Sequence, residues 1–261
     1  MLNAATAMID RSGLTVSLEH ISFEDVIQQA GVSRSAVYRR WPYKDLFFSD
    51  LLKELARATR PAAVSSFEEA TASIRHFALA HLGWLETPEH RHDLVLELIR
   101  RGALNDFETM AGSTEWRTYL ALHATFLSVA DEQLRSDLQA ALAESERGFI
   151  DRIASSWEQL AGLLGYRLRP ELHASFEIVA SLASATLRGL VVMALSTPDI
   201  GSQRIEARLF GSTQTAEWSQ PGITAASIAF AFLEADPTVL WDAQRLGNVR
   251  QGLEALGAYR G

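Results

Sequence analysis

The chain has 261 residues and a net charge of −8, with 48% hydrophobic and 21% charged residues. This balance allows a packed core and excludes an intrinsically disordered chain. The sequence contains no cysteine, which excludes disulfides, thiolate metal sites and cysteine nucleophiles.

The charge is spread unevenly along the chain. Residues 1–57 hold seven basic and seven acidic residues, so the whole net charge lies in residues 58–261. Within the neutral part, one eleven-residue stretch holds four basic residues and no acid: Arg34, Arg39, Arg40 and Lys44. A local basic patch can bind phosphates while an acidic body limits non-specific binding.

Helical periodicity dominates the chain and strand patterns are scarce, which predicts an all-α protein. A first helix is expected over residues 2–11, followed by a loop to about Ile21. Ser22 is typical of an N-cap and Gly31 of a left-handed C-cap. The helix between them is expected to bury four apolar side chains: Phe23, Val26, Ile27 and Ala30.

A third short helix is expected from the cap Ser33 to Arg40, ended by Pro42 because proline disfavours helix in the residue before it. A longer helix is expected over residues 43–59, followed by a hinge at 61–66. Proline and glycine then divide the rest of the chain. Further helices are expected near residues 66–86, 89–105, 114–130, 132–164, 170–196 and 223–235, with an irregular loop at 197–222 and one short helix in 237–261.

Residues 22–41 predict a helix-turn-helix unit. Val37 and Trp41 are four positions apart, so they share the face that anchors the second helix. The opposite face carries two guanidinium groups and two hydroxyls: Arg34, Ser35, Tyr38 and Arg39. Arginine can bind guanine through two hydrogen bonds, while serine and tyrosine can bind phosphate oxygens. This face is therefore suited to a DNA major groove.

The run from Ala30 to Phe47 reads Ala-Gly-Val-Ser-Arg-Ser-Ala-Val-Tyr-Arg-Arg-Trp-Pro-Tyr-Lys-Asp-Leu-Phe. It closely resembles the DNA-binding signature of the tetracycline-repressor (TetR) family, which has an Ala-Gly-Val-Ser start, a Tyr-x-x-aromatic end, then a lysine and an acid. The resemblance covers about residues 2–57. Beyond them the chain shares only the family's all-helical outline.

The resemblance implies DNA contacts at seven positions: Ser22, Ser33, Arg34, Ser35, Tyr38, Arg39 and Lys44. Tyr38 and Lys44 match most tightly and would contact phosphates, while Arg34 and Arg39 would read bases. Three features depart from the family. The loop before Ser22 is longer than usual, and Ile27 replaces a smaller residue. The sequence also begins directly at the first helix, so the basic arm of many members is either absent or precedes this sequence.

Residues 171–196 are apolar on two sides, which indicates one side for the core and one for a partner chain. The resemblance implies that this helix and the helix near 223–235 pair with their copies in a four-helix bundle. The dimer residues expected from these stripes are Ile178, Leu182, Ala185, Val192, Ile228 and Phe232. The alternative is a helix buried inside a monomer.

A pocket for a small-molecule effector is expected between the helices of residues 66–164, because ligand sites are mostly apolar clefts. The candidate lining residues are Trp84, Phe107, Trp116, Tyr119, Phe126 and Trp157. An aromatic residue at helical spacing is more often part of the core, so a core role is the favoured explanation for any one of them.

The sequence therefore predicts an all-α protein with a helix-turn-helix domain at 1–45, a connecting helix at 43–59 and a helical regulatory and dimerisation domain at 46–261. The expected function is a cytoplasmic homodimeric repressor, released from a palindromic double-stranded DNA operator by an unknown small molecule. No catalytic constellation, cofactor motif or membrane partner is expected. His90-x-His92-Asp93 and the pair His76 and His81 carry metal-ligating groups, but neither has the full ligand spacing of a metal site. The alternatives are a helical adaptor and an all-α enzyme, neither dependent on DNA.

Overall fold

The structure is a computed structural model that describes residues 1–12, 21–58 and 64–256. It is mostly helical, as the sequence predicts. The chain divides into two compact units, one of Met1–Ala63 with Ser113–Phe149 and the other of Val64–Gly112 with Ile150–Gly261.

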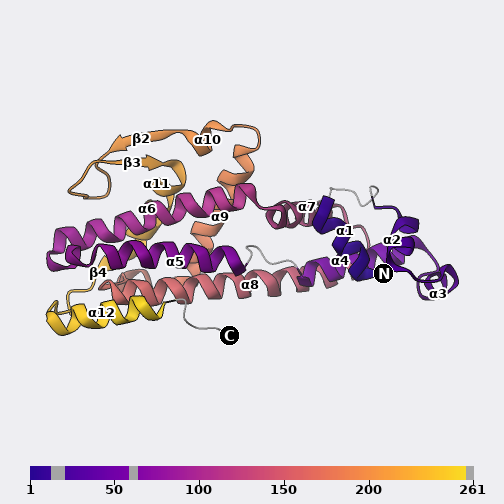
Figure 1. Ribbon diagram of the computed structural model, residues 1–261, viewed down its shortest axis with the longest axis horizontal. Helices are drawn as coiled ribbons and strands as arrows, with labels where there is room; N and C mark the ends of the chain where they lie inside the picture. The colour runs from indigo at the N-terminus through magenta and orange to yellow at the C-terminus, as the bar shows by residue number, and fades with distance from the viewer. Residues whose placement is uncertain (13–20, 59–63, 257–261) are drawn as a thin grey trace. The chain divides into compact units, whose positions relative to one another are not determined.

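The first unit is built only from helices in its described residues. They are α1 (Leu2–Ser12), α2 (Phe23–Ala30), α3 (Arg34–Arg40), α4 (Lys44–Ala58), α7 (Thr114–Ser128) and the first part of α8 (Glu132–Leu163) (Figure 1). The observed starts and ends of the first four helices lie within one residue of the predicted ones. The loop expected between α1 and α2 lies at residues outside the described ranges, apart from Ile21.

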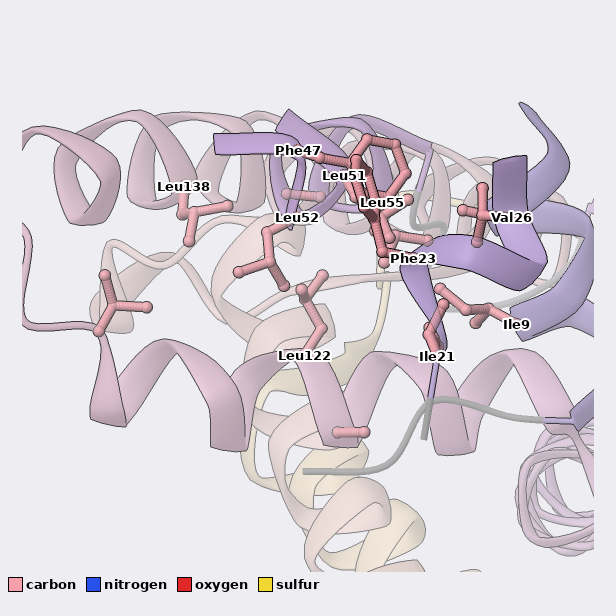
Figure 2. Close-up of a cluster of buried hydrophobic side chains, with 14 of the residues drawn as sticks. Ile9, Ile21, Phe23, Val26, Phe47, Leu51, Leu52, Leu55, Leu122 and Leu138 are labelled. Atoms are coloured by element: carbon pink, nitrogen blue, oxygen red, sulfur yellow. The ribbon is translucent and has the colours of Figure 1, made fainter. Parts of the chain in front are cut away.

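The core of the first unit collects side chains from all of its long helices. Figure 2 shows them pointing toward one another: Ile9 of α1, Phe23 and Val26 of α2, Phe47, Leu51, Leu52 and Leu55 of α4, Leu122 of α7 and Leu138 of α8. The α4 residues recur at three- and four-residue spacing, so one face of that helix enters the core. The helices α1 to α4 therefore share one core with α7 and α8.

The second unit combines helices with short strands. Its helices are α5 (Val64–Ala80), the short 3₁₀ helix η2 (Leu82–Glu86), α6 (Pro88–Gly112), the second part of α8, the 3₁₀ helix η3 (Pro170–Leu172), α9 (Phe176–Ala194), α10 (Asp199–Ser202), α11 (Gln220–Phe232) and α12 (Ala243–Ala255). Helix α6 packs against α5, α9 and α11, and α12 packs against α5 (Figure 1). The helix expected in the tail is confirmed as α12.

One of two antiparallel strand pairs corrects the expectation that residues 197–222 are irregular. Strands β2 (Arg204–Ala207) and β3 (Ala216–Ser219) pair within that segment, and β1 (Tyr166–Leu168) pairs with β4 (Leu233–Ala235). Strands of three or four residues are too short to produce a visible alternation of apolar and polar side chains. The partners β1 and β4 are also far apart in the sequence, so no local turn signal marks them.

Several helix boundaries also differ from the predicted ones. Helix α5 ends at Ala80 and η2 follows it, whereas one helix was expected over 66–86. Helix α6 continues through the expected end at 105 to Gly112. Helix α9 begins only at Phe176, because His173 adopts a left-handed conformation at the end of η3. Residues 64–66 of the expected hinge are helical, and 59–63 lie outside the described residues.

The loop between β2 and β3 is fastened to α6 by two neighbouring side chains. Buried Asp93 accepts hydrogen bonds from the Thr213 amide at 2.9 Å, from the Ser212 hydroxyl at 3.0 Å and from the Thr213 hydroxyl. Burial raises the pKa of Asp93, but these hydrogen bonds outweigh it and hold the pKa below its ordinary value. His92 contacts the Phe210 carbonyl at 2.6 Å through Nε2. His92 and Asp93, two of the potential metal ligands, thus have structural partners within the chain.

Helix α9 is the one helix of the described ranges that is long and apolar enough to cross a bilayer by length and composition. Only 22% of its most apolar 18-residue stretch is buried within the chain. Core helices of soluble proteins can be equally long and apolar, so length and composition are weak evidence for a membrane span. The informative feature is that an apolar face of α9 stays exposed.

The aromatic side chain at the centre of the first core leads to a stability prediction. Phe47 is 0% exposed and its ring lies 5.2 Å from the rings of both Phe23 and Trp41. We expect Phe47→Ala to lower the free energy of unfolding by about 3–5 kcal/mol, because it removes buried surface and leaves a cavity. The matched control is Leu46→Ala on the same helix, since Leu46 is 50% exposed and should change stability by less than about 0.5 kcal/mol. Chemical denaturation followed by circular dichroism measures both; equal losses would contradict this core.

A partly buried acid on α6 leads to a pH prediction. Burial raises the pKa of Asp106 from 3.8 to about 6, so the folded protein resists ionisation of this carboxyl. The folded state is favoured fully below the ordinary pKa, where the carboxyl is protonated in both the folded and the unfolded chain. The free energy of unfolding then falls as the pH rises through 6. We expect Asp106→Asn to be more stable than the wild type at pH 8 by roughly 1–3 kcal/mol, and no more stable at pH 4.

Urea denaturation at both pH values measures this difference. Glu108→Gln is the control, because Glu108 is an exposed acid on the same helix. A difference between the Asp106 variant and the wild type that does not change with pH would refute the assignment.

Candidate nucleic-acid interface

The start of α2 and the turn between α2 and α3 are fixed by capping residues. The Ser22 hydroxyl accepts a hydrogen bond from the Asp25 amide at 3.3 Å, and the Ser33 hydroxyl accepts one from the Ala36 amide at 3.3 Å. Gly31 ends α2 with φ 64°, a left-handed conformation that side chains with a Cβ seldom adopt. The three predicted capping roles are confirmed.

The inner side of α3 is anchored as its spacing predicts. Val37 is 3% exposed, and Trp41 packs against the same core. The Trp41 indole N–H donates a hydrogen bond of 2.9 Å to the Asp50 carboxylate on α4. The end of α3 is therefore tied to α4 by a polar contact as well as by packing.

The outer side of α3 presents polar and basic groups to solvent. Arg34, Ser35, Tyr38 and Arg39 are all exposed, at positions that share one face of the helix. Lys44 is exposed at the start of α4. Neither Arg39 nor Lys44 forms an ion pair with any residue of the described ranges. Two cationic side chains near α3 are thus available to an anionic partner.

The other two predicted contact residues, Ser22 and Ser33, use their hydroxyls as helix caps. Ser33 Oγ also lies 3.4 Å from Ser35 Oγ. A capping hydroxyl keeps its own proton free to donate elsewhere, because the cap uses only its acceptor capacity. Of the seven predicted residues, four lie on α3, Ser22 and Ser33 cap α2 and α3, and Lys44 begins α4.

An acid that the sequence analysis did not select lies among these residues. Glu24, on the first turn of α2, forms an ion pair of 2.7 Å with Arg34 and accepts a hydrogen bond of 3.2 Å from the Tyr38 hydroxyl. That hydrogen bond is the main cause of a raised pKa at Tyr38, so the phenol stays protonated and able to donate. No local pattern links residues ten and fourteen positions apart, so this contact required the packing of α2 against α3.

The six aromatic residues predicted to line an effector pocket do not all lie in one compact unit. Trp116, Tyr119 and Phe126 belong to the first unit, and Trp84, Phe107 and Trp157 belong to the second. Trp116 and Tyr119 are buried and stacked, with ring centroids 4.9 Å apart. Phe107 is also buried, and Phe126 packs against the core of the first unit. The effector pocket remains a prediction.

The two apolar stripes predicted on the helix of residues 171–196 differ in burial. In the first stripe, Val179 is buried and five residues are partly buried, namely Phe176, Ala183, Leu187, Leu190 and Ala194. Leu172, the first residue of that stripe, lies in η3 before the helix and is exposed. In the second stripe, Ile178, Leu182, Ala185, Val192 and Leu195 are exposed. The expected dimer residues on α11, Ile228 and Phe232, are partly buried, and α11 packs beside α9. The alternative of a helix wholly buried in the chain is excluded.

No family model, curated protein or solved structure matches this chain.

Proposed function

We propose that the protein is a sequence-specific DNA-binding transcriptional regulator in which α3 enters the major groove. The observation that carries this proposal is the two-sided character of α3. Val37 and Trp41 fix its inner side, while Arg34, Tyr38 and Arg39 extend into solvent from its outer side. The resemblance of residues 30–47 to the TetR signature supports the same reading.

In this proposal, α2 and α3 form the helix-turn-helix and α4 connects it to the rest of the chain. Arg39 is suited to the paired acceptors of guanine, and Arg34 can serve in the same way once it leaves Glu24. Lys44 and Tyr38 would bind phosphates and so set the position of the helix on the duplex. A net negative charge on the rest of the chain then limits non-specific binding.

The protein is proposed to act as a homodimer through α9 and α11. The exposed residues of α9 from Ile178 to Met193 include no charged side chain and several small ones, among them Ala185 and Gly189. Small residues allow two helices to approach closely, and a second copy offers the same face by twofold symmetry. Two copies of α3 would then lie about one DNA turn apart, roughly 34–36 Å, which suits a palindromic operator.

We further propose that this cytoplasmic dimer is a repressor, without catalytic activity, that a small-molecule effector releases from DNA. The effector would bind in the helical regulatory domain and act through α4. To change occupancy it must bind the DNA-incompetent form more tightly, with a coupling free energy of about 1–3 kcal/mol. The aromatic residues named above are the candidate contacts for such a ligand.

Selection of bound duplexes from a random DNA pool tests the function directly. We expect the wild type to enrich a palindrome, and its affinity to fall as salt rises, since phosphate contacts release counterions. The double variant Tyr38→Ala/Arg39→Ala should fold normally and enrich nothing, because both side chains are exposed.

Failure of the wild type to enrich any sequence, while it remains a folded dimer, would reject the regulator. A dimer that captures protein partners without DNA would favour a helical adaptor. Turnover of a substrate unaffected by the double substitution would favour an enzyme.

The dimer surface has its own prediction. Leu182 is 43% exposed on α9, and Leu182→Glu would place a charge on both sides of a twofold interface. We expect sedimentation equilibrium to show dimerisation weakened by at least about tenfold. Leu240→Glu is the matched control, because Leu240 is 80% exposed outside α9 and α11. A wild type that stays monomeric, or an equal loss in both variants, would contradict the assigned surface.

A further inference from the structure

The contact between Glu24, Arg34 and Tyr38 places an anion inside the surface proposed to bind DNA. Both carboxylate oxygens are used, one by the Arg34 guanidinium at 2.7 Å and the other by the Tyr38 hydroxyl at 3.2 Å. The side chains are largely exposed, at 74% for Arg34 and 47% for Glu24. An ion pair so open to water adds little to stability, so a stabilising role does not account for it.

The local packing holds this group in place. Tyr38 meets Phe23 edge to face with ring centroids 5.8 Å apart, and Phe23 is part of the core. The caps Ser22 and Ser33 fix the first turns of α2 and α3, which carry Glu24 and Arg34. The three side chains therefore meet because of the way in which α2 packs on α3.

The carboxylate occupies the same donors that a DNA phosphate would use. Guanidinium and phenol groups bind carboxylate and phosphate oxygens through the same kind of charge-assisted hydrogen bond. A phosphate that takes Arg34 from Glu24 exchanges one anionic acceptor for another. It also leaves an unpaired carboxylate beside the negative DNA backbone. Contact with an arbitrary phosphate thus gains little from Arg34.

A base edge differs from a phosphate in this respect. Guanine offers two acceptors in a fixed arrangement that matches the arginine fork, which compensates for the loss of the carboxylate. We infer that Glu24 is a specificity-determining residue, which withholds Arg34 and Tyr38 from DNA of unrelated sequence. This inference rests on the proposed DNA-binding function and adds to it an acid that lowers non-specific affinity.

The test measures binding to a mixed-sequence duplex, by fluorescence anisotropy over about 50 to 200 mM salt. Glu24→Gln frees Arg34 and adds one net cation to the interface. We expect its plot of log affinity against log salt to be steeper than that of the wild type by about 0.9. Over this fourfold range of salt, the variant should lose about three- to fourfold more affinity than the wild type.

Asp25→Asn is the matched control, since Asp25 is the next residue, is exposed and lies in the same first turn. Both substitutions remove one negative charge and the same favourable interaction with the helix dipole. Only Glu24→Gln should steepen the slope. Glu24→Gln/Arg34→Ala should have the same slope as Arg34→Ala alone, because Glu24 acts through Arg34.

The outcomes separate the two levels of the proposal. Equal slopes for Glu24→Gln and Asp25→Asn, with a wild type that binds, would overturn the role of Glu24 and leave the DNA-binding function standing. A slope that Glu24→Gln still steepens when Arg34 is replaced by alanine would also overturn the role of Glu24. If folded wild type and folded Glu24→Gln both fail to bind at every salt concentration, the DNA-binding function itself is overturned.

Discussion

Packing of the partly buried Trp41 against the buried aromatic residues Phe23 and Phe47 is the constraint on which the proposed function depends. A seven-residue helix such as α3 does not form by itself in water, because nucleation is costly and few hydrogen bonds repay it. The core stabilises α3 through the packing of Val37 and Trp41 on the inner side of the helix. The exposed side chains of α3 have a defined direction only because its inner face is fixed.

The parts of the fold governed by local chemistry could be predicted from the sequence. Capping by Ser22 and Ser33 and the left-handed Gly31 involve residues only three or four positions apart, so their patterns are visible in the chain. The two stripes of α9 were predictable for the same reason, since helical periodicity shows which side chains share a face. Periodicity could not show which stripe would be covered by the chain's own helices.

Features that depend on contacts between distant residues could not be predicted. The pairing of β1 with β4 joins residues 166–168 to 233–235, and neither strand is long enough to show alternation. The contacts of Glu24 with Arg34 and Tyr38 depend on the packing of α2 against α3. Anchoring of the loop after β2 by Asp93 likewise joins residues about 120 apart. In each case the decisive partner lies beyond the range of a local pattern.

The proposed DNA-binding surface carries both cations without an ion pair in the described part of the chain and a cation that is paired with an acid. Arg39 and Lys44 have no ion pair among the described residues, whereas Arg34 is neutralised by Glu24. A basic surface with a built-in acid binds phosphate less strongly, which favours sites that reward the arginine fork. A protein that binds a palindromic operator also needs a twofold-related partner, and the exposed face of α9 would bind that partner.

The most direct test of the central claim, that α3 lies in a major groove, uses the absence of cysteine from the chain. A single cysteine introduced by Ser35→Cys on α3 can carry an iron chelate that cleaves nearby DNA, with Ser155→Cys on α8 as the control. If α3 lies in the groove, the α3 probe cuts a selected palindromic duplex in two clusters about one helical turn apart, while the α8 probe cuts at no defined position. Cleavage by the α3 probe that is no more localised than by the control would contradict the placement of α3 in the groove.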